Sequence, residues 1–446
     1  MLPSIKRINS YVDSAFAGFG INKTREIARL LYEIAKREHI SFRSIISHHR
    51  GKNFYACKEE LLKRRYPFMH SLSGDKSCFY LPKLDVDPAL KVRFSNNASF
   101  CPKHIFVERL VRNSPLACRL KELFPRASFS VIDSVKNFLQ CELSCNPIQS
   151  FNKRGENIFI TRENYDFIKP CPCTRGAVSC GYYVLNIGFG CTHECSYCFL
   201  QEYQNVPGII FPANPEDFFK HAHLLKSVRG MFPYVRLGSG EFTDSLLFDS
   251  YTGYSRIISE AVKHYPDIVF EFKTKSVAIE NLLTRPPEKN IVVSWSLNPQ
   301  TIIHENEWFT PSLCERVSAA AACARHGFKV AFHLDPIIYY QGWRKDYREV
   351  VNYLFDRIDY RSLQWISLGT LRFNRGLKKI MENRFPENKI LDEEMILGFD
   401  GKMRYSDPLR IEMYSGIISD IRARNKRTFI YLCMEARSIH EKVFSR

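Results

Sequence analysis

The chain has 446 residues, of which 45% are hydrophobic and 25% are charged, a balance that indicates a folded globular protein and excludes wholesale disorder. No run approaches the roughly eighteen apolar residues of a membrane-spanning helix, and the N-terminal stretch lacks a signal-peptide core, so we expect a cytoplasmic protein without a membrane partner. Fifteen cysteines without a secretory signal favour packing, metal or redox roles over a disulfide scaffold.

The formal net charge of +17 is unevenly distributed, because the first hundred residues hold 18 Lys and Arg against 9 Asp and Glu. Basic clusters at 63–65 and 422–427 would suit a phosphate backbone, although a solvated surface explains any single cluster as well. The overall excess is the better evidence, and it favours a polyanionic partner. We expect this partner to be DNA.

The N-terminal region, residues 1–100, is predicted to be a basic, partly helical extension without a recognisable role. Within it, residues 22–40 repeat apolar positions at the three- and four-residue spacing of an amphipathic helix, with Ile27, Leu30 and Ile34 on one face. Residues 101–180 contain short apolar alternations bounded by Pro and Asn, which predict a small α/β subdomain.

Three cysteines, Cys171, Cys173 and Cys180, come just before the next predicted strand. They could bind a second metal or supply a reactive thiol, but packing cysteines are the simpler interpretation. Cys433 is a further candidate thiol whose neighbours have the pattern of a buried strand.

From residue 181 to 446, strand-like and helix-like segments alternate, which predicts βα units around a parallel sheet. The expected strands are 181–188, 234–238, 267–275, 290–298, 328–336 and 363–373. The expected helices are 214–228, 254–265, 312–327 and 346–358.

Polar residues follow five of these strands in succession, and in parallel barrels functional groups gather at the carboxyl ends of strands. Polar residues also mark strand ends for purely structural reasons, but the recurrence favours a ring of polar groups around one cavity. The residues are Ser239, Glu241, Thr243, Asp244, Lys273, Lys275, Ser294, Ser296, Asn298, His333, Asp335, Thr370 and Arg372.

The loop after the first of these strands carries Cys191, Cys195 and Cys198 in a C-x₃-C-x₂-C pattern, with Tyr197 before the last thiol. A structural zinc site normally takes four ligands, whereas three thiolates can bind three irons of a 4Fe–4S cluster and leave the fourth open. A zinc site or a chance cluster remains the alternative.

This motif resembles the signature of the radical S-adenosylmethionine superfamily. The resemblance implies an α/β fold, a partial (β/α)₆ barrel, in which Cys191, Cys195 and Cys198 hold a 4Fe–4S cluster. It also implies that S-adenosyl-L-methionine is the cofactor and that its cleavage by one electron gives a 5′-deoxyadenosyl radical. The electron would come from a donor such as a flavodoxin or a ferredoxin.

Residues 103–446 resemble more narrowly the spore photoproduct lyase family, DNA repair enzymes that return a cross-linked thymine pair to two thymines. The matching stretches include "CSYCFLQ", "FEFKTKS", "SWSLN", "FHLDPIIYYQGWRKDY", "ISLGTLRF" and "GKMRYSDPLRIEMY". The resemblance implies that Lys275 and Ser296 bind S-adenosylmethionine, together with Thr243, where the family has a serine.

Two positions depart from the family pattern. Glu241 stands where the lyase has a hydrogen-donating cysteine, and Phe199 stands where it has a tyrosine, which leaves Tyr197 as the expected catalytic tyrosine. The stretch "GSGE" also resembles the Gly-Gly-Glu element that binds the cofactor's amino group in many superfamily members. We therefore expect Glu241 to bind the cofactor.

Candidate substrate contacts follow from residue type. Tyr339 and Tyr340 could stack on bases, and Arg372, Arg404 and Arg410 could contact phosphates, although packing and surface roles explain each residue individually. His333 is a further candidate substrate contact. The leading expectation is repair of a pyrimidine photoproduct in DNA. The alternatives are a radical enzyme acting on RNA or a peptide, and a nucleic-acid-binding protein with a non-catalytic cluster.

Overall fold

The computed structural model describes residues 3–46, 53–72, 76–94, 100–142, 146–225 and 232–445. The chain forms two compact units. Unit 1 comprises Met1–Arg93, Ile338–Tyr340 and Leu371–Arg410, and unit 2 comprises Phe94–Ile337, Gln341–Thr370 and Ile411–Arg446. The division into regions at residues 100 and 180 stays a prediction, and the units show in addition that 371–410 groups with the N-terminal residues.

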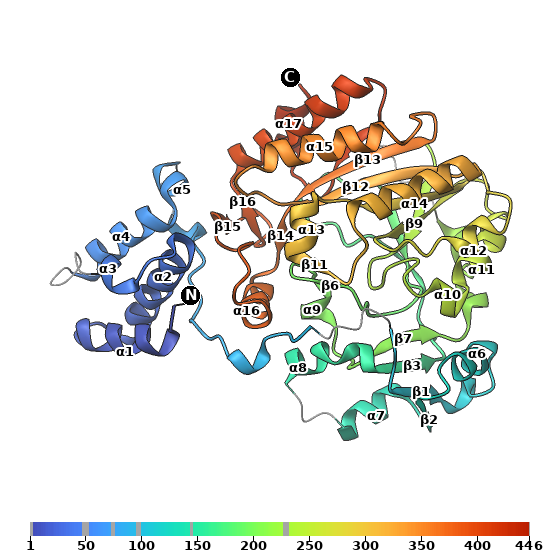
Figure 1. Cartoon of the computed structure of the whole chain (residues 1–446), viewed down its shortest axis with the longest axis horizontal. Helices are drawn as coiled ribbons and strands as arrows, with labels where there is room; N and C mark the ends of the chain where they lie inside the picture. Colours follow the sequence, from blue (N-terminus) through green and yellow to red (C-terminus); the bar gives the residue numbers. More distant parts are fainter. Residues whose placement is uncertain are drawn as a thin grey trace. The chain divides into compact units, whose positions relative to one another are not determined.

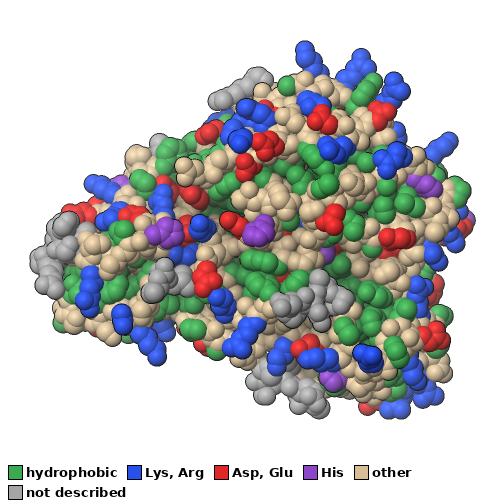
Figure 2. Space-filling model, in the orientation of Figure 1, with side chains coloured by type: hydrophobic (Ala, Val, Ile, Leu, Met, Phe, Trp, Pro, Cys, Tyr) green, Lys and Arg blue, Asp and Glu red, His purple; other side chains and the backbone are tan. Residues whose placement is uncertain are grey.

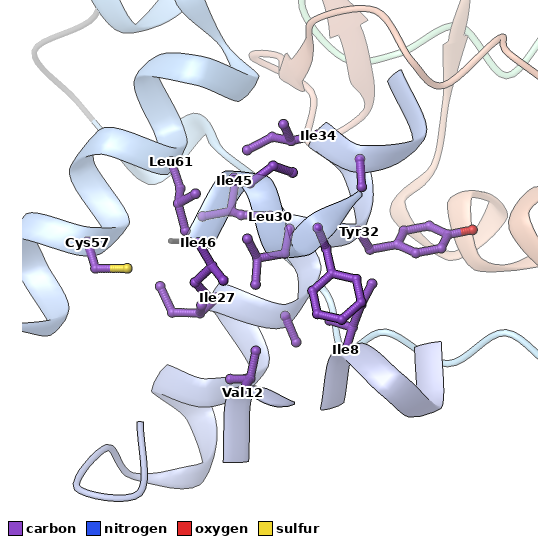
Figure 3. Packing of buried hydrophobic residues seen from close by; sticks show 14 of the residues in the cluster. Ile8, Val12, Ile27, Leu30, Tyr32, Ile34, Ile45, Ile46, Cys57 and Leu61 are labelled. Carbon is purple, nitrogen blue, oxygen red and sulfur yellow. The ribbon is translucent and has the colours of Figure 1, made fainter. Parts of the chain in front are cut away.

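The N-terminal part of unit 1 is helical, with α1 (Ile5–Ala15), α2 (Ile21–Glu38), α3 (Phe42–Ile46), α4 (Phe54–Arg65) and α5 (Pro67–Leu72). Helix α2 confirms the amphipathic helix expected at 22–40, and it ends where His39 adopts a left-handed backbone. Its apolar face packs against α1, α3 and α4, where the buried side chains point toward one another (Figure 3). The labelled residues of this core are Ile8, Val12, Ile27, Leu30, Tyr32, Ile34, Ile45, Ile46, Cys57 and Leu61.

The rest of unit 1 adds helix α16 (Arg375–Arg384) and a small sheet of β14 (Arg372–Phe373), β16 (Met403–Tyr405) and β15 (Met395–Leu397). Buried ion pairs join α16 to the N-terminal helices: Lys378 contacts Glu33 at 2.7 Å, and Arg29 contacts Glu382 at 2.7 Å. Because buried charges are costly unless paired, these contacts tie the two segments together.

Unit 2 is built on an eight-stranded sheet in the order β17-β13-β12-β10-β9-β8-β5-β4. All six strands expected from the sequence are present, and the sheet continues with β17 at one edge and an antiparallel β4 at the other. The curled parallel sheet confirms the predicted partial barrel. Its strands are β4 (Ile168–Pro170), β5 (Tyr182–Leu185), β8 (Val235–Ser239), β9 (Ile268–Thr274), β10 (Ile291–Ser296), β12 (Lys329–Ile337), β13 (Leu363–Thr370) and β17 (Ile430–Leu432).

Three of the four expected barrel helices are confirmed as α11 (Tyr254–Val262), α14 (Leu313–His326) and α15 (Trp343–Phe355). Figure 1 shows α14 and α15 lying along β12 and β13. Helix α14 starts at a capping box between Ser312 and Glu315. Further helices beyond residue 199 are α9 (Leu200–Tyr203), α10 (Asp249–Thr252), α12 (Glu280–Leu283), α13 (Gln300–Asn306), α17 (Asp407–Arg424) and α18 (Arg437–Phe444).

The helix expected at 214–228 is wrong for the residues described there, which form only 3₁₀ turns at Pro215–Asp217 and Ala222–Leu224. Asn214 explains the difference, since its buried amide donates to the Glu163 carbonyl and to the Asp217 carboxylate. These bonds fix the start of the segment to a neighbouring strand end and compete with helix formation. Residues 226–228 lie outside the described part of the chain.

A second, four-stranded parallel sheet in the order β2-β1-β3-β7 lies within unit 2. It comprises β1 (His104–Glu108), β2 (Ser128–Ile132), β3 (Asn157–Thr161) and β7 (Ile209–Pro212), with helices α6 (Pro115–Leu123), α7 (Val135–Glu142) and α8 (Pro147–Asn152). The small α/β layer expected before residue 180 therefore takes its last strand from beyond the three-cysteine loop. That connection holds the loop between two sheets.

Within the described ranges, none of the helices combines the length and the apolar character needed to cross a membrane. Lys and Arg side chains are spread over the face seen in Figure 2 and alternate there with Asp and Glu. The positive charge of the face visible in Figure 2 is therefore dispersed and does not form one patch.

Candidate functional site

The three cysteines lie on the loop that leaves β5, and glycine shapes the start of this loop. Gly190 has a φ of +99°, and a Cβ atom there would come within 2.8 Å of the Ile209 side chain, so a larger residue would be strained. Farther along, β6 (Glu194–Cys195) pairs with β11 (Glu307–Trp308). The loop is thereby fixed by backbone geometry on both sides of Cys191.

Arg154 holds the loop from the side of the small sheet. Its buried guanidinium donates to the carbonyls of Cys191 at 2.6 Å and His193 at 2.9 Å, and to the Glu194 carboxylate at 2.5 Å. On the other side, the Gln201 amide donates to the carbonyls of Cys195, Ser196 and Cys198. These bonds position the cysteine backbone without using the thiols.

The three thiols lie close enough to interact electrostatically with one another. Burial raises the pKa of each, that of Cys195 to about 12, while the nearby Lys275 ammonium acts in the opposite direction on Cys195 and Cys198. No three Cys, His, Asp or Glu side chains of the described residues stand at the spacing of one shared metal ion. A cluster that offers a separate iron to each thiolate accommodates such wider spacing.

Thr243 follows β8 and Lys275 follows β9, and Asp244, next to Thr243, bonds to the end of β9. The Asp244 carboxylate accepts hydrogen bonds from the Thr274 hydroxyl at 2.5 Å and from the Lys275 backbone N–H at 2.7 Å. The Lys275 ammonium lies 5.8 Å from the centre of the Tyr197 ring. The Thr243 hydroxyl is buried and has no hydrogen-bond partner among the residues that the structure describes.

Glu241 and Ser296 complete the set of expected cofactor residues. Burial raises the pKa of the half-buried Glu241 carboxyl, and Lys273 and Lys169 oppose the shift. Ser296, at the end of β10, is buried, and its carbonyl accepts a hydrogen bond from Arg316 at 3.0 Å. Both residues are placed by strand ends, as expected for groups around a barrel opening.

Tyr197 belongs to a buried polar network that the sequence did not reveal. Its hydroxyl donates to the Glu307 carboxylate, which also accepts hydrogen bonds from Asn298 at 2.9 Å and Arg316 at 2.6 Å. Burial and the Glu307 charge raise the pKa of Tyr197 well above its usual range, so this phenol stays protonated at neutral pH. Because Glu307 and Arg316 are more than a hundred residues from Tyr197, no local motif could have identified them.

The residues present fit the groups that the motif implies. Three thiols offer the donor set of an iron–sulfur cluster. The Lys275 ammonium near them, and the Thr243 hydroxyl, which has no partner among the described residues, suit a ligand that carries a carboxylate and hydroxyl groups. A buried hydroxyl without a hydrogen bond lowers the stability of the folded protein, and a hydrogen bond to a bound ligand would remove that cost.

The expected substrate residues belong to both units, His333 to unit 2 and the others to unit 1. His333 is buried on β12 and bonds to Glu271 at 2.6 Å, while the Tyr339 N–H donates to the Tyr405 hydroxyl at 3.1 Å. Arg404 pairs with Asp400 at 2.6 Å. In the same unit, half-buried Arg372 faces Arg404 across a strand pair, and Arg410 pairs with Asp407 at 3.1 Å.

Burial of Arg404 and Arg410 disfavours a direct contact with phosphate, because each guanidinium already has a carboxylate partner. Tyr340 and Arg372 are half-buried. The substrate roles of these residues stay predictions.

The model of the family described as spore photoproduct lyase matches residues 100–405, which is more than half of the chain. The chain belongs to the spore photoproduct lyase family. It is 24% identical over 308 residues to the spore photoproduct lyase of Bacillus subtilis, covering 66% of this chain and 86% of the relative. The enzyme of that name from Geobacillus sp. is 26% identical over 305 residues, with the same coverage of 66% and 86%.

Solved structures of spore photoproduct lyase share the fold. One complexed with dinucleoside spore photoproduct superposes with a TM-score of 0.64 at 22% identity, covering 75% of this chain and 99% of that chain. A mutant form with bound AdoMet and dinucleoside spore photoproduct gives a TM-score of 0.63 at 21% identity, with coverage of 75% and 99%. The family is one of radical S-adenosylmethionine enzymes with a 4Fe–4S cluster, as the sequence motif predicted.

Proposed function

We propose that this protein is a radical S-adenosylmethionine lyase that acts on a pyrimidine photoproduct in DNA. The observation that carries this proposal is the set of three cysteines on the loop after β5, the Lys275 ammonium near them, and the buried Thr243 hydroxyl, which has no hydrogen-bond partner among the described residues. Membership of the spore photoproduct lyase family supports the same chemistry.

Cys191, Cys195 and Cys198 are the residues that would hold the 4Fe–4S cluster. When bound, the cluster and S-adenosylmethionine supply a carbon radical that can abstract a hydrogen atom from a substrate. The chain's contribution is to orient and enclose: Arg154 and Gln201 fix the loop, and Asp244 fixes Lys275.

Four residues would bind S-adenosylmethionine. The Lys275 ammonium and the hydroxyls of Thr243 and Ser296 suit its carboxylate and ribose, and the Glu241 carboxylate suits its ammonium group. Since burial raises the pKa of Glu241, a bound cation would favour the charged carboxylate that the structure otherwise disfavours.

Tyr197 is proposed as the catalytic tyrosine, and Glu307 as the residue that positions it. The Tyr197 hydroxyl donates to Glu307, and Arg316 balances the charge of that carboxylate at 2.6 Å. The pair holds the phenol in one orientation inside a closed network, as an ordered path for a proton requires.

DNA as the substrate and a flavodoxin or ferredoxin as the electron donor are parts of the same proposal. The formal net charge of +17 supports a polyanionic partner. The relatives named above act on or were solved with spore photoproduct, which supports a thymine-derived lesion.

Glu241 stands where the family has a hydrogen-donating cysteine, and this difference favours a second candidate function. In it, the same radical chemistry acts on RNA or a peptide. A carboxylate cannot donate a hydrogen atom as a thiol does, so the product radical must be quenched by another group or belong to another substrate.

The test is to incubate reconstituted protein, reductant and S-adenosylmethionine with ultraviolet-irradiated thymine-rich DNA, and to measure recovered thymine by mass spectrometry. Irradiated RNA of matched sequence and unirradiated DNA are the controls. The proposal predicts that thymine is recovered from irradiated DNA and from neither control. Cofactor cleavage that is stimulated by RNA or a peptide, without thymine recovery, would favour the second candidate.

A further inference from the structure

A second group of cysteines, apart from the loop that carries Cys191, lies where the barrel sheet closes. Cys171 and Cys173 follow β4, Cys180 precedes β5, and Cys433 follows β17 at the opposite edge of the sheet order. Cys171 interacts electrostatically with the other three thiols. The fold therefore gathers four cysteines that are up to 262 residues apart, the difference between positions 433 and 171.

Backbone contacts hold these segments together independently of the thiols. Val178 donates to the Glu435 carbonyl at 2.8 Å, and Ala177 pairs with Ala436 in an isolated antiparallel bridge. The segment between β4 and β5 thus runs along the chain that follows β17. Cys433 is fixed by its N–H, which donates to the Leu368 carbonyl at 2.7 Å.

The pair of Cys171 and Cys173 already has the spacing of two ligands on one metal ion. Their sulfur atoms lie 3.9 Å apart, and two thiolates bound to one tetrahedral zinc at about 2.3 Å lie roughly 3.8 Å from each other. No third ligand of the described residues joins the pair at that spacing. Metal binding would therefore require Cys180 and Cys433, both half-buried, to turn toward the pair.

The buried guanidinium of Arg236 can balance part of the negative charge of such a centre. Arg236 is 1% exposed, its Nε and Nη1 atoms have no hydrogen-bond partner among the described residues, and it interacts electrostatically with Cys180. Four thiolates around a divalent metal carry a net charge of about −2, so an adjacent guanidinium stabilises the centre. The Nη2 atom of this guanidinium already pairs with the Glu271 carboxylate at 3.2 Å, and its other two nitrogen atoms have no such partner among the described residues.

We propose that Cys171, Cys173, Cys180 and Cys433 form a second thiolate metal centre that closes the barrel between the β4–β5 connection and β17. Four thiolates suit either one zinc ion or the iron atoms of a second iron–sulfur cluster. The centre has a structural role, because it joins the two edges of an open sheet, and it is independent of the substrate of the enzyme.

The test is the zinc and iron content of anaerobically purified full-length protein, measured by mass spectrometry for four variants alongside the unmodified chain. Cys173→Ser and Cys433→Ser remove a proposed ligand, Cys198→Ala removes a ligand of the first cluster, and Cys118→Ser changes an exposed cysteine on α6. We expect about one zinc per chain, or iron above about four atoms per chain, in the unmodified protein. Cys173→Ser and Cys433→Ser should lose this additional metal, whereas Cys118→Ser and Cys198→Ala should keep it.

A metal-stripped sample of the unmodified chain gives a second readout in case the serine variants do not fold. Cobalt(II) added to it should produce the visible absorption of a tetrahedral thiolate complex in Cys198→Ala as well as in the unmodified protein. Zinc near zero together with iron at or below about four per chain would overturn the proposal, as would additional metal that survives Cys173→Ser and Cys433→Ser.

Discussion

The guanidinium of Arg154 lies 2.5 Å from a carboxylate oxygen of Glu194, and both side chains are buried next to the loop that carries the three cysteines. The same guanidinium donates to the carbonyls of Cys191 and His193. One side chain, from the 3₁₀ turn before β3, therefore pairs with the Glu194 charge and also positions the backbone of the loop.

Arg154→Ala should lower the free energy of unfolding by about 3–5 kcal/mol, because Glu194 would remain buried without its partner. The loop should also lose its geometry, so iron loading should fall. Chemical denaturation and iron analysis measure the two effects. Arg162→Ala is the matched control, since the exposed pair of Arg162 and Asp217 at 3.7 Å should contribute about 0–1 kcal/mol. Equal losses in both variants would contradict this role of Arg154.

Thr243→Val should weaken S-adenosylmethionine binding by about 0.5–1.5 kcal/mol, which is up to about tenfold, because a hydroxyl reserved for the ligand is removed. Stability without the ligand should hold or rise, since the Thr243 hydroxyl has no partner among the described residues. Calorimetric titration and thermal unfolding separate the two quantities. In contrast, Thr274→Val should destabilise the protein, because it breaks the bond to Asp244. Unchanged affinity in Thr243→Val would remove Thr243 from the cofactor site.

Glu241→Gln should weaken S-adenosylmethionine binding by about 1.5–3 kcal/mol, because a charged contact becomes neutral. The binding form is the carboxylate, and burial raises the pKa of Glu241. Affinity of the unmodified protein should therefore fall as the pH is lowered through that raised pKa, and the glutamine variant should lack this dependence. If Glu241 lies near the substrate instead, affinity for the cofactor should be unchanged and only product formation should decrease.

Tyr197→Phe should leave cofactor cleavage intact while thymine recovery falls, if this phenol serves the step after hydrogen abstraction. The protein should still fold, because Glu307 keeps its bonds to Arg316 and Asn298. Assays of 5′-deoxyadenosine and of thymine on the same samples separate the two steps. Phe309→Tyr, which changes an exposed aromatic residue two positions after Glu307, is the control. Normal thymine recovery by Tyr197→Phe would exclude the catalytic role.

Much of the barrel could be predicted because its signals are local. Each of the six strands is a short apolar run with a polar end, and helices such as α14 carry both cap signals, Ser312 before and Gly327 after. The spacing of Cys191, Cys195 and Cys198 is local as well. The helix expected at 214–228 failed because a tertiary contact of Asn214 outweighed the helical pattern.

The parts that escaped prediction depend on residues distant in sequence. Lys378 and Glu33 meet in unit 1 although neither stands in a recognisable pattern. Arginine is usually a surface residue, but Arg404 is fully buried and pairs with Asp400. Periodicity reports which face of an element is apolar, whereas the partner of a buried charge is set only when distant elements pack.

The most direct test of the central claim is reductive cleavage of S-adenosylmethionine by anaerobically reconstituted protein, with 5′-deoxyadenosine measured by chromatography. The account predicts about four irons per chain in the first cluster and repeated formation of 5′-deoxyadenosine by the unmodified protein. It predicts loss of this activity in Cys198→Ala, and retention in Cys118→Ser. A fully iron-loaded protein that forms no 5′-deoxyadenosine, or a Cys198→Ala variant that forms it at the unmodified rate, would contradict the claim.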